Sequence, residues 1–320
     1  MNIQQALKTS ADKLKQKNIP SASLDAEVLL LEALNKNRDK TWLYIHNNYK
    51  LNKDEEKLFN NFISQREKHK PVAYIINRKE FYGYNFYVNE NVLIPRPETE
   101  LIVEKVLKII SGVHSLECKN TVSNSAYRLK PKLRSKKITL LDIGTGSGCI
   151  PISILNELVK NKKSGFIKNT FANDISKKAI EVAKINAKKY NLDQKIKFII
   201  GDLEKAISKK IFLNSSQIII TANLPYIKNS DYETLQPNVR NYEPAIALKA
   251  GKDGLDYIKK LLDLISKTQL KLNQNIYLFL EADPEQMNKI TAVLNEKFDN
   301  LNIRIIKDLN GKERIIVALL

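Results

Sequence analysis

Cysteine is scarce in this chain, which has only Cys118 and Cys149 among its 320 residues. Two cysteines exclude a disulfide framework and are typical of proteins that work in a reducing compartment. No stretch approaches the ~20 consecutive apolar residues that a membrane-spanning helix needs, and the first residues lack the basic and apolar segments of a secretory signal. Together these absences predict a soluble, cytoplasmic, globular protein with no membrane association.

Histidine is equally rare, and His46, His69 and His114 are scattered along the chain. None of them has a second histidine or cysteine at the short spacing that metal sites use. The sequence therefore predicts no metal. Cys149 is expected to pack as a small buried side chain rather than to act as a nucleophile.

Acidic residues are too few to balance the basic ones: 35 Asp and Glu stand against 53 Lys and Arg, and the formal net charge is +18. Such an excess is common in nucleic-acid-binding proteins, but here lysines are spread over every predicted element. Residues 112–137 concentrate them, with Glu117 as their single acid. Little apolar periodicity and many Ser and Asn predict a basic loop there. A solvated loop is the favoured interpretation, and a weak contact with RNA or the ribosome is the alternative.

The first seventy residues contain three stripes of apolar residues at helical spacing. Asn52 followed by Glu55 resembles a capping box and predicts the start of the third helix. The next residues are rich in aromatic and branched side chains around turn residues, which indicates a β-hairpin. We therefore expect a small helical bundle over 1–78, acting as a recognition or packing unit, and a β-hairpin linker over 79–95.

The remainder of the chain, residues 96–320, is expected to form one domain in which strand patterns alternate with helical ones. This alternation predicts a parallel, doubly wound α/β sheet with helices on both faces. The chain ends differently, because two strand patterns flank Asn310-Gly311, the strongest short hairpin signal. A sheet that ends in an antiparallel hairpin is typical of class I methyltransferases and unusual for nucleotide-binding dehydrogenases.

A glycine loop follows the first of these strands, with the sequence Gly144-Thr145-Gly146-Ser147-Gly148. Its G-x-G-x-G spacing differs from the dinucleotide-binding G-x-G-x-x-G. Asp142, just before the loop, is unsuited to pyrophosphate but suits a ligand with an ammonium and a sulfonium group. Asp174 ends the second strand, where it can accept two ribose hydroxyls, and Asp202 follows the third, near an adenine amine or as a helix N-cap. The set predicts S-adenosylmethionine as the cofactor.

A second motif, Asn223-Leu224-Pro225-Tyr226, lies at the end of the fourth strand. Ligands of open α/β sheets bind beyond the carboxyl ends of the strands. The side-chain oxygen of Asn223 and the carbonyl of Leu224 could accept both N–H bonds of a planar amide or an aromatic amine. Pro225 would stiffen the turn and Tyr226 would pack on the planar group. These residues are the predicted catalytic and substrate-binding residues, and the local motif leaves open whether the acceptor is an amide or an adenine.

The chain resembles the release-factor glutamine methyltransferases (the PrmC/HemK family) over almost its full length. The resemblance rests on segments 71–75 and 92–100, the glycine loop, residues 223–227, Tyr242-Glu243-Pro244 and the turn at 307–311. It implies methylation of the glutamine in the Gly-Gly-Gln motif of peptide chain release factors, in translation termination. The family also implies that the N-terminal helices help to bind the substrate protein. By position, Gly144–Gly148, Asp174 and Asn223 would contact S-adenosylmethionine and residues 223–226 the glutamine.

Two departures from the family pattern stand out. Leu224 replaces the first proline of the usual Asn-Pro-Pro-Tyr, and Leu203 replaces the aromatic residue that commonly covers the adenine. The carbonyl at 224 survives the first change. The competing functions are an adenine-N6 methyltransferase acting on RNA or DNA, for which the motif and the charge would also be suitable, and a non-catalytic binding protein.

Overall fold

The computed structural model describes residues 1–34, 39–112, 138–208, 211, 217–269, 275–299 and 301–320. Most of the basic segment 112–137 lies outside this set, so the prediction of a basic loop there stays a prediction. None of the described helices is long and apolar enough to cross a membrane. The described residues also contain no cluster of three or more His, Cys, Asp or Glu able to hold a metal ion.

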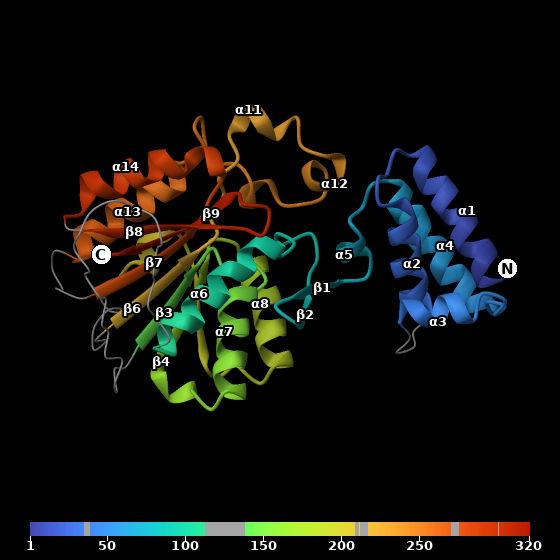
Figure 1. Cartoon of the computed structure of the whole chain (residues 1–320), viewed down its shortest axis with the longest axis horizontal. Helices are drawn as coiled ribbons and strands as arrows, with labels where there is room; N and C mark the ends of the chain where they lie inside the picture. Colours follow the sequence, from blue (N-terminus) through green and yellow to red (C-terminus); the bar gives the residue numbers. More distant parts are fainter. Residues whose placement is uncertain (35–38, 113–137, 209–210, 212–216, 270–274, 300) are drawn as a thin grey trace.

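Four N-terminal helices pack into a bundle, drawn at the blue end of Figure 1: α1 (Ile3–Gln16), α2 (Ala22–Ala33), α3 (Lys40–Ile45) and α4 (Lys53–Glu67). The expected capping box is confirmed. The Asn52 side chain accepts from the N–H of Glu55 at 2.9 Å, and the Glu55 carboxylate accepts from the N–H of Asn52 at 3.0 Å. The apolar stripes meet inside the bundle in a core separate from the two that flank the large sheet.

A short helix, α5 (Val72–Ile75), leads into a two-stranded antiparallel hairpin of β1 (Arg78–Phe81) and β2 (Tyr84–Tyr87). The hairpin is shorter than the 79–95 linker that the sequence suggested, because residues 88–95 form no strand. Val88, Val92 and Ile94 are buried instead against Tyr74 and helix α8 (Lys177–Lys189). Apolar residues in this linker therefore reflect packing rather than strand pairing.

In the described part of the chain, seven strands form the large sheet in the order β5-β4-β3-β6-β7-β9-β8. Five are parallel: β3 (Ile138–Ile143), β4 (Ile167–Asp174), β5 (Ile196–Ile200), β6 (Gln217–Ala222) and β7 (Asn275–Glu281). The last two are β8 (Asn302–Lys307) and β9 (Glu313–Leu319), and β9 is antiparallel to both of its neighbours. The predicted class I methyltransferase sheet with its terminal hairpin is confirmed.

Helices cover both faces of the sheet, as Figure 1 shows. One face carries α6 (Glu100–Ile110), α7 (Cys149–Lys160) and α8, and the other carries α9 (Leu203–Ala206), α13 (Asp256–Gln269) and α14 (Met287–Lys297). Short helices complete the connections: η1 (Pro97–Thr99), η2 (Ser164–Phe166), α11 (Asn229–Tyr232), α12 (Pro237–Arg240), η3 (Ala245–Ala247) and η4 (Pro284–Gln286). Every residue of β3 and β6 is buried, which accounts for their nearly continuous apolar sequence.

The strand order reverses between β3 and β6. From β3 the chain proceeds outward to β4 and β5, whereas β6 and β7 lie on the opposite side. The loops that follow β3 and β6 therefore diverge and leave a crevice at the carboxyl edge of the sheet. Both sequence motifs begin at this edge, since Ile143 is paired with Ala222 in the parallel register.

Candidate active site

The predicted site residues, apart from Asp142, Gly148 and Tyr226, line one cavity at the carboxyl ends of four strands. They are Gly144, Thr145, Gly146, Ser147, Asp174, Asp202, Leu203, Asn223, Leu224 and Pro225. Segments from outside the sheet complete the wall, mainly from 91–96 and 244–247. The fold thus brings together residues that are 80 positions apart in the sequence.

The glycine loop presents its backbone to this cavity. Gly146 has a φ of +53°, and a Cβ built there would meet no atom within 4 Å, so its main chain borders open space. Helix α7 begins behind the loop at Cys149, with Gly148 as its N-cap. Gly148 itself faces the interior rather than the cavity, because a Cβ there would lie 2.9 Å from Ile152 Cδ1.

Asp174 ties the loop to the end of β4. Its Oδ2 accepts from the N–H of Gly146 and its Oδ1 accepts from the N–H of Ser176, both at 2.9 Å. A carboxylate has about four acceptor positions, so two remain for a ligand in the cavity. Burial raises the pKa of Asp174, and the two N–H donors offset part of that effect. The geometry suits a ligand that offers two adjacent hydroxyl groups.

Asp142 lies behind the loop and not in the cavity, contrary to its expected role beside a charged ligand. Its side chain is completely buried, its Oδ1 accepts from the Thr221 hydroxyl at 2.6 Å, and its Oδ2 has no hydrogen-bond partner within the described ranges. Burial raises the pKa of Asp142 to about 7. The buried hydroxyls of Thr145 and Ser147 also have no hydrogen-bond partner of normal geometry among the described residues. These two hydroxyls are the side-chain polar atoms of the loop whose hydrogen-bonding capacity is unused among the described residues.

Asp202 and Leu203 lie side by side at the start of α9. Asp202 is the N-cap of this helix, and its side chain accepts from the N–H of Lys205 at 3.3 Å. It also lines the cavity, so the two interpretations of this residue are compatible. Leu203 is buried and contributes an apolar wall to the cavity.

Asn223 directly follows β6 and lies beside the glycine loop. Its Nδ2 donates to the Thr99 hydroxyl at 3.0 Å, whereas its Oδ1 has no hydrogen-bond partner among the described residues. The carbonyl of Leu224 is likewise without a partner in the described part of the chain. Two hydrogen-bond acceptors are therefore available at the cavity wall.

Leu224 compensates for the missing proline by packing. Its side chain is buried in the apolar core under α13 and α14. A Cβ built on Gly144 would lie 3.2 Å from its Cδ2, so the two motifs are in close contact at this point. The turn is thus fixed by an apolar anchor in place of a proline ring.

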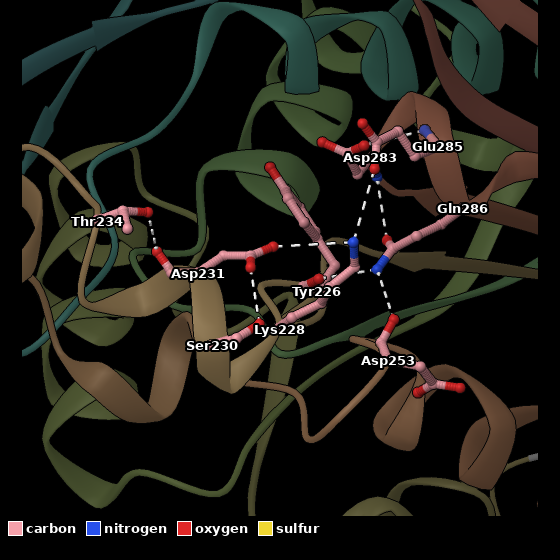
Figure 2. Close-up of polar contacts among 9 residues, drawn as sticks. All are labelled: Tyr226, Lys228, Ser230, Asp231, Thr234, Asp253, Asp283, Glu285 and Gln286. Atoms are coloured by element: carbon pink, nitrogen blue, oxygen red, sulfur yellow. Dashed lines mark hydrogen bonds and ion pairs between the residues drawn. The ribbon is translucent and has the colours of Figure 1, made fainter.

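Tyr226 is held mainly through its backbone, as Figure 2 shows. Gln286 Nε2 donates to the carbonyl of Tyr226 at 2.9 Å and to that of Asp253 at 3.2 Å. Lys228, two residues further on, lies within 3.8 Å of Asp231 and 3.6 Å of Glu285. Burial raises the pKa of the Tyr226 hydroxyl, and the nearby Glu281 adds to this effect. The segment after Pro225 is therefore clamped from two sides.

The structure adds residues that the motif analysis did not assign to the site. Arg96 and Thr99 line the cavity, as do Tyr257 and Lys260 of α13. Glu243 is buried and accepts from Arg96 Nη2 at 2.6 Å and from the N–H of Ile94 at 3.1 Å. This agrees with a structural role for Glu243. Arg96 and Thr99 belong to the family-specific segment 92–100, which could have indicated them as site residues. No motif in the sequence indicates the two α13 residues.

The N-terminal bundle meets the methyltransferase sheet near this rim. The Tyr242 hydroxyl donates to the carbonyl of Lys68 at 2.6 Å, next to the buried Glu243. Arg78 of the hairpin pairs with Glu32 of α2 at 2.6 Å. The bundle is therefore connected to a segment that also borders the cavity.

Comparison with known proteins identifies both parts of the chain. Residues 5–76 match the PrmC N-terminal domain and residues 134–242 match a methyltransferase domain. The hMettl16 catalytic domain, solved in complex with MAT2A 3′UTR hairpin 6, has the same fold with a TM-score of 0.51. Its sequence identity is 15%, and the match covers 89% of this chain and 93% of that one.

Two curated relatives cover nearly all of this chain. The bifunctional methyltransferase of Rickettsia conorii is 34% identical over 99% of the chain, which spans only 57% of that longer protein. The release factor glutamine methyltransferase of Leptospira interrogans is 38% identical over 97% of the chain and 96% of its own length. With the predicted fold and the paired sequence motifs in place, this chain belongs to the family of release factor glutamine methyltransferases.

Proposed function

We propose that this protein methylates the side-chain amide nitrogen of the glutamine in the Gly-Gly-Gln motif of peptide chain release factors, using S-adenosylmethionine. The observation that carries the proposal is the pair of free acceptors at the cavity wall, Asn223 Oδ1 and the Leu224 carbonyl, beside the glycine loop. The relative from Leptospira interrogans, with matching length, bears this activity in its name.

The residues around the cavity fit the proposed cofactor. Asp174 has acceptor positions left for a ribose, and Asp202 lies at the adjacent strand end within the same cavity. Leu203 supplies an apolar surface for a base, and the exposed backbone of Gly146 allows a close approach. When bound, S-adenosylmethionine supplies an electrophilic methyl group on a sulfonium. No strong base is required, because the sulfonium is already a good leaving group.

Orientation of the acceptor amide is the task left to the protein. The lone pair of an amide nitrogen is delocalised and poorly nucleophilic, so it must be held in the direction of attack. Asn223 Oδ1 and the Leu224 carbonyl would accept the two N–H bonds of the glutamine side chain and stabilise the positive charge that develops on nitrogen. Pro225 and the clamp on the Tyr226 backbone keep these acceptors in place. Tyr226 would pack against the glutamine.

We assign substrate recognition to the bundle of residues 1–78, a connecting role to 79–95 and catalysis to 96–320. The support is the bundle's match to the PrmC N-terminal domain and its contact with the cavity rim through Tyr242. Release factors act in the cytoplasm, and we propose that this enzyme does too. An RNA or ribosome contact of the segment 112–137 stays a prediction.

An adenine-N6 methyltransferase is not favoured as the alternative, because the N-terminal match and the full-length relatives point to release factors. The test is incubation of the protein with labelled S-adenosylmethionine and either a release factor or ribosomal RNA. Label should enter the factor, and substitution of its Gly-Gly-Gln glutamine should abolish the signal. Label in RNA alone would contradict the proposal.

The matched variant in this assay is Asn223→Ala. Loss of the Oδ1 acceptor should reduce the turnover number by at least about a hundredfold, as for other preorganised dipoles in active sites. Cofactor binding, measured by calorimetry, should remain largely intact because Asp174 and the loop are unchanged. Full activity of Asn223→Ala would remove the proposed mechanism.

A further inference from the structure

Thr99 connects the family-specific segment before α6 to the reactive turn. It is the last residue of η1, is almost fully buried, and its hydroxyl accepts from Asn223 Nδ2 at 3.0 Å. A hydroxyl that accepts one hydrogen bond still has a proton to donate. The group that accepts this proton determines how Thr99 can orient the side-chain amide of Asn223.

Glu281 is the partner that the fold provides. It ends β7, the strand beside β6, and the register pairs Leu280 with Ala222, so Glu281 stands next to Asn223 in the sheet. Glu281 is only 3% exposed, and the Thr99 side chain acts to lower its pKa, against the larger effect of burial, which raises it. Its Oε2 is buried and has no hydrogen-bond partner in the part of the chain that the structure describes. A buried carboxyl of this kind is unusual in an apolar sheet and the methyl-transfer mechanism above does not use it.

Glu281, Thr99 and Asn223 form a row of polar side chains. The protonation state of Glu281 sets the direction of hydrogen bonding along this row. An ionised Glu281 carboxylate can only accept, so in a hydrogen bond between Thr99 and the ionised Glu281 the Thr99 hydroxyl is the donor. Thr99 can then only accept from the amide, so Asn223 must turn its Nδ2 towards Thr99. The Oδ1 atom is thereby left facing away from Thr99, free to accept a substrate N–H. With the amide reversed, an NH₂ group would meet the substrate NH₂, and no hydrogen bond could form.

We propose that Glu281 and Thr99 are positioning residues that select the orientation of the Asn223 amide and so present Oδ1, rather than Nδ2, to the glutamine amide. This inference rests on the proposed function of the Asn223 turn. It also gives the threonine of the Pro95–Glu100 segment a role in the reaction, where the sequence alone suggested only a family signature.

The protonation state of Glu281 sets the direction of the row. Burial raises the pKa of Glu281 to about 7, and Glu98 adds to the increase, while Thr99, Arg314 and Arg96 oppose it. Tyr226 faces the same carboxyl from the reactive turn. A protonated Glu281 can donate to Thr99, which then donates to Asn223 and favours the reversed amide. The turnover number is therefore expected to fall as the pH decreases through the pKa of Glu281.

The first test compares Thr99→Val with Thr99→Ser in the full-length protein. Valine matches threonine in shape but cannot take part in the row, whereas serine keeps the hydroxyl. We expect Thr99→Val to lower the turnover number about ten- to a hundredfold, the range that small misplacements in active sites produce, with cofactor affinity unchanged. Thr99→Ser should restore most of the activity. Equal turnover of Thr99→Val and wild type would overturn the inference.

The second test measures the turnover number of Glu281→Gln as a function of pH. A carboxyl with a purely structural role would not control how the turnover number falls at acid pH. Wild type should lose activity on the acid side of its profile, and this limb should be absent in Glu281→Gln, whose turnover is lower throughout. An unchanged acid limb in this variant would contradict the role of Glu281. A wild-type enzyme that leaves the release factor unlabelled overturns the proposed function and this inference together, whereas an active wild type with normal Thr99→Val overturns this inference alone.

Discussion

A methyl group added at Gly254 would test whether the clamp on the reactive turn controls both stability and catalysis. Gly254 has a φ of +75°, and a Cβ built there would lie 2.3 Å from the carbonyl oxygen of Tyr226 and 2.3 Å from Gln286 Nε2. These two atoms are themselves hydrogen-bonded at 2.9 Å. The substitution Gly254→Ala would therefore push apart the pair that holds the chain just after Pro225.

The expected cost has two parts. A non-glycine residue in the left-handed region costs roughly 1–2 kcal/mol. Weakening the bonds of Gln286 to the carbonyls of Tyr226 and Asp253 adds about 1 kcal/mol for each bond. The total is about 3–4 kcal/mol, which corresponds to a decrease in Tm of roughly 10 °C for a domain of this size.

Gly311 supplies the matched control. Its φ is +76°, but a Cβ there would meet nothing within 4 Å. Gly311→Ala should cost only the conformational part, about 1–2 kcal/mol, and should leave methyl transfer unchanged. The difference between the two variants isolates the contact with the Tyr226 carbonyl.

Two measurements decide the outcome. Thermal unfolding should separate Gly254→Ala from Gly311→Ala by several degrees, and the methyl-transfer assay should show a lower turnover number only for Gly254→Ala. Cofactor affinity should be similar in both, because neither residue lines the cavity. If Gly254→Ala unfolds and turns over like Gly311→Ala, the reasoning about the clamp is refuted.

Two further predictions concern buried charge. Arg66→Ala should lower the free energy of unfolding by about 3–5 kcal/mol, because it leaves Asp25 buried without its 2.7 Å partner; Arg78→Ala, which breaks the more exposed pair with Glu32, should cost at most about 1 kcal/mol. Similar losses in denaturant unfolding would contradict this. Burial raises the pKa of Asp142 to about 7, so the unfolded chain binds fewer protons there, and stability should fall as the pH rises from about 4 to about 7. Asp142→Asn should flatten this part of the stability profile, and an unchanged slope would count against the burial argument.

Local sequence was sufficient for the elements whose signals are local. The capping box at Asn52 and Glu55 predicts a helix start because both partners lie within one turn. The alternation of strands and helices, and the hairpin around Asn310, predicted the sheet and its antiparallel strand correctly. The linker after Tyr87 was less predictable, because Val88 and Val92 are apolar for packing against α8 and not for strand pairing.

The candidate site follows the same division. Asp174 and Asn223 could be located because ligands of such sheets lie at the carboxyl ends of the strands, which the sequence marks. Asp142 occupies an equally suggestive position in the sequence, yet its side chain points into the interior and is wholly buried. Alternation of side chains along a strand depends on its register at the strand end, and that was not visible in the sequence.

The sequence by itself determined the chemistry that this chain can offer: a glycine loop, acids at successive strand ends, and an asparagine followed by a proline turn. Tertiary structure decided how these groups are oriented. Thr99 and Glu281 lie 182 residues apart, as their numbers show, and meet at Asn223 only because β6 and β7 are neighbours and η1 covers their ends. Hydrogen bonds have direction, and the direction at Asn223 is set by partners that no local pattern could supply.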